Sequence, residues 1–145
     1  MLATPRFYTA CVQLPATNSP TPPEIQESPK FYPFFKDALG AIDGTHIRCT
    51  SSAAERDQSR NRKGILTQNC LAVCTFDLCF TYFLSSWKGS SHDSMLFYDA
   101  RQVDFYILGG RYYLADAGFT SSDVLLVPYR SVRYHLSEWD RAKEA

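Results

Sequence analysis

The segment Gln68–Trp87 constrains the fold more than any other part of the chain. Two runs of β-branched and aromatic residues, Leu71–Phe76 and Cys79–Leu84, meet at the short break Asp77-Leu78. Runs of this length and composition are typical of β-strands rather than of helices. A tight turn between two strands joins antiparallel neighbours, so we predict a β-hairpin here.

The segments on either side predict further strands and one helix. Ala41–Ile47 and Tyr112–Ala115 have the pattern of strands, and Val124–Val127 that of a last short strand. The apolar residues of Met95–Leu108 approximate one helical stripe, and Gly109-Gly110 would end that helix in left-handed backbone. A strand–helix–strand passage implies a parallel pair of strands. Together with the antiparallel hairpin, it predicts an α/β fold with a mixed sheet covered by helices.

Composition divides the chain into an arm and a domain. Proline is frequent in residues 1–30, among Thr, Ser, Asn and Glu, which predicts an extended N-terminal arm or linker. Residues 31–145 form the expected folded domain, in a chain that is 45% apolar. No apolar run approaches the roughly 20 residues that a membrane-spanning helix needs, so we expect no membrane contact. We also expect no signal peptide, because proline and polar residues interrupt Met1–Pro15.

Charge and cysteine content narrow the possible functions. Fifteen basic residues balance fifteen acidic ones, so a nucleic-acid partner would have to be recognised by a local site and not by a global positive field. The five cysteines are odd in number and lie in apolar surroundings, which predicts reduced thiols inside a cell.

Three aspartates share one local setting: each lies at or beside the end of an apolar run, next to a small residue. They are Asp43, Asp93 and Asp116. Carboxylates at strand ends are ligands for hard cations such as Mg²⁺, and a pair of such ions can promote phosphodiester cleavage. Each aspartate also has a simpler interpretation. Asp43-Gly44 is a hairpin-turn signal, Asp93 could be the N-cap of a helix, and Asp116 could form a turn. The residues alone permit a metal site without establishing it.

Five motifs follow one another along the chain: Ala41–Ile47, Asn61–Gly64 with Gln68–Leu71, Trp87–Ser94, Tyr113–Gly118 and Val127–Leu136. In this order they resemble the DDE-type nuclease domain of Harbinger-family transposases and their domesticated nuclease relatives. The resemblance extends from about Phe31 to Trp139. It implies a ribonuclease H-like mixed sheet flanked by helices, a Mg²⁺ or Mn²⁺ cofactor, a DNA substrate and nuclear residence. It also leaves room for a separate DNA-binding partner protein.

The resemblance also assigns roles to the three aspartates. Asp43 would be the first catalytic carboxylate and metal ligand, Asp116 the second, and Asp93 a further metal ligand. His92, next to Asp93, is a candidate assisting group because histidine exchanges protons near neutral pH. Four basic residues are candidate contacts to backbone phosphates. They are Arg62, Lys63, Arg130 and Arg133.

One expected element of the family has no counterpart. Its final glutamate lies in a downstream helical segment resembling Arg-Asn-x-Ile-Glu-Arg, and neither Glu138 nor Glu144 has that context. We therefore expect a C-terminally truncated domain with poor or absent nuclease activity by itself, because a lost carboxylate weakens the binding of at least one ion. The alternatives are a catalytically dead remnant that binds DNA or protein, and a fragment that folds poorly.

Overall fold

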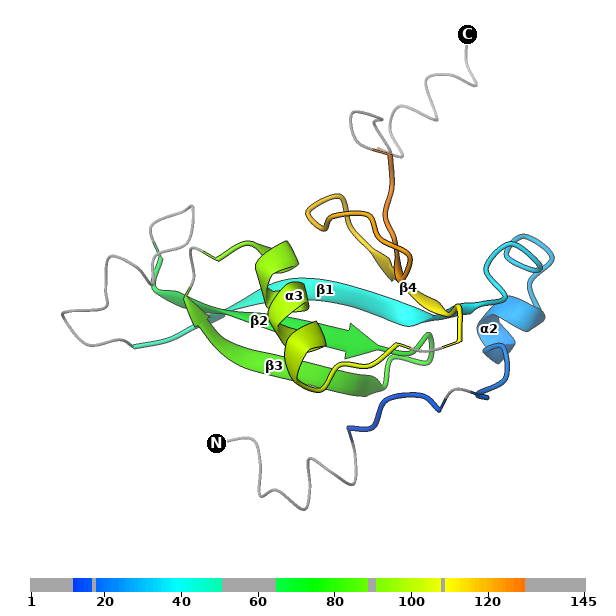
Figure 1. Ribbon diagram of the computed structural model, residues 1–145, viewed down its shortest axis with the longest axis horizontal. Coiled ribbons are helices and arrows are strands. Elements are labelled where there is room, and N and C mark those ends of the chain that lie inside the picture. The colour runs from blue at the N-terminus through cyan, green and yellow to red at the C-terminus, as the bar shows by residue number, and fades with distance from the viewer. Residues whose placement is uncertain (1–11, 17, 51–64, 89–90, 108, 130–145) are drawn as a thin grey trace, which may run out of the picture.

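The computed structural model describes residues 12–16, 18–50, 65–88, 91–107 and 109–129. Its centre is a five-stranded sheet with the strand order β3-β2-β1-β4-β5 (Figure 1). The strands are β1 (Ala38–Arg48), β2 (Thr67–Cys74), β3 (Phe80–Lys88), β4 (Tyr112–Ala115) and β5 (Leu125–Leu126). Within the described residues two helices accompany the sheet, namely α2 (Pro23–Gln26) and α3 (Asp93–Val103).

The sheet is mixed, as predicted. β1 pairs antiparallel with β2, and β2 pairs antiparallel with β3, which confirms the hairpin. On its other side β1 pairs parallel with β4, and β4 pairs parallel with β5. The chain therefore leaves the outer strand β3, passes through α3 and returns beside the central strand β1. This sheet with its two helices is consistent with a ribonuclease H-like core.

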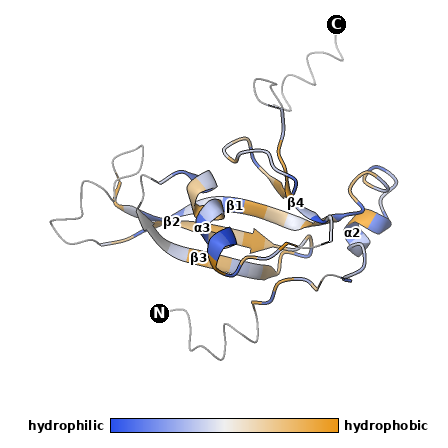
Figure 2. Ribbon diagram, in the orientation of Figure 1, coloured by the Kyte–Doolittle hydropathy of each residue, from blue (hydrophilic) through white to orange (hydrophobic). Residues whose placement is uncertain are grey.

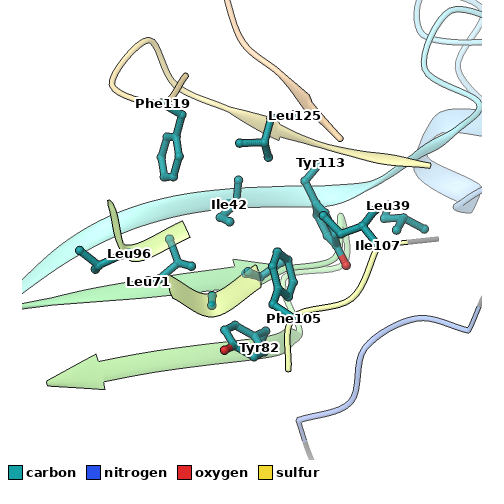
Figure 3. Close-up of a cluster of buried hydrophobic side chains, with 12 residues drawn as sticks. Leu39, Ile42, Leu71, Tyr82, Leu96, Phe105, Ile107, Tyr113, Phe119 and Leu125 are labelled. Atoms are coloured by element: carbon teal, nitrogen blue, oxygen red, sulfur yellow. The ribbon is translucent and has the colours of Figure 1, made fainter. Parts of the chain in front are cut away.

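The core lies between the sheet and α3, which covers one face of β1, β2 and β3 (Figure 1). Figure 2 shows hydrophobic stretches on β1 and β2, and hydrophilic residues on α3. Phe105 is fully buried, with its ring centroid 4.7 Å from that of Tyr82 and 5.6 Å from that of Tyr113. Figure 3 shows these rings together with Leu71 and Leu96, so side chains from four elements and one loop meet in the same cluster.

The helix ends earlier than predicted. α3 stops at Val103 and not at Leu108, although Gly109 and Gly110 do have positive φ values of 71° and 72°. Two interactions explain the early end. Tyr82 of β3 donates a hydrogen bond of 2.6 Å to Asp104 Oδ1 directly after the helix, and Phe105 turns into the core. Burial of the aromatic ring therefore outweighs the local preference for a longer helix.

The described part of the N-terminal segment contacts the sheet region. Ile25 of α2 is only 4% exposed, and Leu14 packs against the core cluster. Arg111 donates from Nη1 to the carbonyl of Ser19 and from Nε to the carbonyl of Asp37. The division of the chain at residue 30 stays a prediction.

Two further predictions concern cysteines and membranes. Cys49, Cys70, Cys74 and Cys79 form no disulfide bond within the described part of the chain, and Cys11 lies outside it. No helix in the described ranges has the length and apolar character needed to cross a bilayer.

Candidate metal centre

Asp43 lies within β1, where its neighbour Gly44 pairs with Leu71 of β2. The interpretation of Asp43-Gly44 as a hairpin turn is therefore wrong. The extended backbone continues through both residues because β1 is paired on both sides at this level, with β2 at Asp43 and with β4 at Ile42. Asp43 Oδ1 accepts a hydrogen bond of 2.8 Å from the backbone N–H of Gly44.

Asp93 is the first residue of α3, and the N-cap position before it is His92. The interpretation of Asp93 as the N-cap is therefore wrong. Its carboxylate has a different partner, since Asp93 Oδ1 accepts a hydrogen bond of 3.0 Å from Nδ2 of Asn69 on β2. A negative charge in the first turn is also favoured by the positive end of the helix dipole.

Asp116 follows directly after β4 and accepts a hydrogen bond of 2.8 Å from the N–H of Gly118. This is the bond expected of a turn-forming aspartate. The carboxylate of Asp116 is nevertheless exposed at the end of β4, so it is also accessible to a metal ion.

Two glycines reveal how close the aspartates lie. A Cβ atom on Gly118 would be 3.0 Å from Asp116 Oδ1 and 3.6 Å from Asp93 Oδ2, so the two carboxylates flank the same point. A Cβ atom on Gly44 would be 2.0 Å from Asp93 Oδ1. Three segments that are distant in the sequence therefore bring these acidic side chains together.

The electrostatics of Asp43 agree with this arrangement. Partial burial raises the pKa of its carboxyl above 3.8, and the negative charges of Asp116 and Asp93 raise that pKa further. The hydrogen bond from Gly44 lowers it in part. Like charges this close repel each other, and a bound cation would relieve the repulsion.

Ser94 links the beginning of α3 to the loop after β4. Its Oγ donates to the carbonyl of Gly118 at 3.2 Å and accepts from the N–H of Thr120 at 3.1 Å. The segment carrying Asp93 and the segment carrying Asp116 are thus joined by hydrogen bonds one residue beyond Asp93.

The donor set suits a hard divalent cation. Among the residues that the structure describes, no group of three or more His, Cys, Asp or Glu side chains forms a ready cage for a metal ion. Mg²⁺ does not require such a cage, because it is usually held by one or two carboxylates, with water and substrate phosphates completing its octahedron. The carboxylates of Asp93 and Asp116 on either side of one point fit that mode of binding.

The other predicted site residues divide into two groups. His92 is exposed at the start of α3, beside Asp93. The four predicted phosphate contacts, Arg62, Lys63, Arg130 and Arg133, lie outside the described residues. Asn69 was not among the predicted site residues, although the sequence holds one signal, the alternation of Asn69 with Leu71 and Val73 in a strand-like run. The structure shows that all three are buried, so a polar residue occupies an inward position.

The mixed sheet with its helices defines an α/β domain, and Asp43 on β1, Asp93 on α3 and Asp116 after β4 define its acidic site. Comparison with known families agrees: the profile of the DDE superfamily endonuclease family matches residues 42–144. The chain belongs to this family. No curated protein and no solved structure matches the chain.

Proposed function

We propose that this protein is a divalent-metal-dependent DNA endonuclease domain of the transposase-derived, Harbinger type. The observation that carries the proposal is the approach of Asp43, Asp93 and Asp116 to one another from β1, α3 and the end of β4. Membership of the endonuclease family supports a phosphodiester substrate. The order of the five sequence motifs supports the Harbinger type.

The three aspartates would hold Mg²⁺ or Mn²⁺ in this proposal. When bound, such an ion activates water and stabilises the leaving oxygen in phosphodiester hydrolysis. The protein itself supplies the concentrated negative charge and its fixed placement. β1 presents Asp43, the first turn of α3 presents Asp93, and the turn after β4 presents Asp116. His92 is exposed beside Asp93 and would exchange protons near the reacting phosphate.

DNA is the proposed partner, contacted through Arg62, Lys63, Arg130 and Arg133, with a separate DNA-binding protein supplying target choice. The resemblance to Harbinger-family transposases implies that the protein resides in the nucleus. We expect cleavage by these 145 residues to be weak, because the downstream glutamate implied by the resemblance has no counterpart in them.

A plasmid-nicking assay with Mg²⁺ or Mn²⁺ tests the proposal, combined with calorimetric titration of Mn²⁺. We expect Mn²⁺ uptake and slow nicking by the wild type, and the loss of both in Asp43→Ala and Asp116→Asn. Asp77→Asn is the matched control, because Asp77 is an acidic residue in the turn between β2 and β3. Binding of Mn²⁺ and DNA without nicking would identify a catalytically dead binding module instead. Neither uptake nor nicking would overturn the proposal.

A further inference from the structure

Asn69 is a polar side chain in an apolar interior. It is fully buried on β2, on the inward face that it shares with Leu71 and Val73. Burying an amide costs free energy unless its hydrogen-bonding groups are satisfied. A residue of this kind in a hydrophobic core calls for a specific reason.

The hydrogen bonds of Asn69 point to that reason. Both bonds are donated by Nδ2, one of 2.9 Å to the carbonyl of Ser91 and one of 3.0 Å to Asp93 Oδ1. Both acceptors are oxygens, so only the amino end of the amide can occupy this position. Among the residues that the structure describes, Asn69 Oδ1 is buried and has no hydrogen-bond partner. The hydrogen bonds of the amide that the structure records therefore all go to residues at the start of α3.

The bond to Asp93 also decides which way that carboxylate faces. Oδ1 accepts the bond from Asn69 and lies against Gly44 of β1. With Oδ1 fixed on the side of β1 and β2, Oδ2 is directed to the point near Gly118 that Asp116 flanks from its other side. Gly44 contributes by having no side chain, since a Cβ atom there would overlap the carboxylate.

We propose that Asn69 is a positioning residue that orients the Asp93 carboxylate toward Asp116. Its role in metal binding rests on the function proposed above, whereas its effect on the conformation of Asp93 does not. Replacing a residue that hydrogen-bonds to a metal ligand, without itself contacting the metal, typically changes metal affinity about tenfold to a hundredfold.

A double-mutant cycle measures the action of Asn69 through Asp93. We expect Asn69→Leu to weaken Mn²⁺ binding by about tenfold or more, and to cause no further loss in an Asp93→Ala background. Val73→Ala is the matched control, because Val73 is equally buried on the same face of the same strand and should leave Mn²⁺ affinity unchanged. Additive losses for Asn69→Leu and Asp93→Ala would show that Asn69 acts only on the fold, and would overturn the proposal.

A second readout does not depend on metal. NMR scalar couplings report the χ1 rotamer of Asp93, and we expect one rotamer in the wild type and averaging among several in Asn69→Leu. If Asn69→Leu fails to fold, Asn69→Asp replaces it, because this substitution keeps the size of the side chain but removes the amide donor. We expect the same averaging of the Asp93 rotamer in Asn69→Asp. A wild type that binds no Mn²⁺ would contradict the proposed function alone. A single unchanged rotamer in a folded variant would overturn the positioning role.

Discussion

Gly44 lies directly against the carboxylate of Asp93, so that a Cβ atom on Gly44 would come within 2.0 Å of Asp93 Oδ1. The central strand can hold the carboxylate this closely only because residue 44 has no side chain. We predict that Gly44→Ala forces Asp93 to rotate and to lose its bond to Asn69. We expect a cost of about 1–3 kcal/mol in the free energy of unfolding, together with weaker Mn²⁺ binding by calorimetry.

Gly110→Ala is a useful control for that variant. Gly110 has a φ of +72°, and among the described residues beyond its two chain neighbours no atom lies within 4 Å of the position of its Cβ. The substitution should cost about 1–2 kcal/mol through backbone strain alone and leave Mn²⁺ affinity unchanged. A Gly44→Ala protein that binds Mn²⁺ as tightly as the wild type would contradict the close contact.

The raised pKa of Asp43 predicts a pH-dependent stability. The native state holds this proton more tightly than the unfolded chain, whose carboxyl titrates near 3.8, so Asp43 destabilises the fold as the pH rises above that value. Asp43→Asn should therefore be more stable than the wild type at pH 7 without metal, and equally stable below pH 3.8. The carboxyl of Asp43 is only partly buried and the residue is largely accessible to solvent, so screening keeps the gain below about 1 kcal/mol. Urea titrations at pH 7 and below pH 3.8 measure the difference in the free energy of unfolding between Asp43→Asn and the wild type.

Asp77→Asn should not share the stabilisation expected of Asp43→Asn, because the pKa of Asp77 is shifted in the opposite direction. The Thr75 hydroxyl donates to the Asp77 carboxylate and lowers its pKa. Ionised Asp77 therefore stabilises the native state at pH 7, and its replacement should bring no gain. Equal stabilisation by Asp43→Asn and Asp77→Asn would show that the crowding of the three carboxylates has no effect.

Phe105 is predicted to be the most sensitive position of the core. It is fully buried, and its ring contacts those of Tyr82, Phe97 and Tyr113. Phe105→Ala should cost about 3–5 kcal/mol because it removes a large apolar side chain and leaves a cavity. Phe34→Ala, at a side chain that is 77% exposed, should change the midpoint of urea unfolding little. Similar midpoints for the two variants would contradict the described core.

The early end of α3 yields a separate test. Tyr82→Phe removes the hydroxyl that donates to Asp104 and keeps the buried ring. Hydrogen bonds to charged groups contribute about 1.5–3 kcal/mol, and exposure of Asp104 favours the lower end of that range. Hydrogen exchange of the amides at residues 100–105 should accelerate in this variant. Unchanged exchange would show that burial of Phe105 alone ends the helix.

Local patterns in the sequence predicted the strands well and the longer-range contacts poorly. β4 has the predicted bounds, whereas β1, β2 and β3 overlap the predicted runs but begin or end at other residues. The end of α3 was wrong because a glycine pair is a strong local signal, whereas the contact of Phe105 with β3 and β4 joins distant segments. The turn interpretation of Asp43 failed for the same reason, since only pairing with β2 and β4 keeps that dipeptide extended.

The position of β1 between an antiparallel and a parallel neighbour has a consequence for the order of assembly. The antiparallel partner β2 is the next strand in the sequence, whereas Ala115 must return across more than seventy positions to pair with Ile42. Contacts between such distant positions form late, because closing a long loop costs entropy before the contact repays it. Affinity for a divalent ion would therefore arise at the last stage of folding. The time course of ion binding during refolding would then report when the native state is complete.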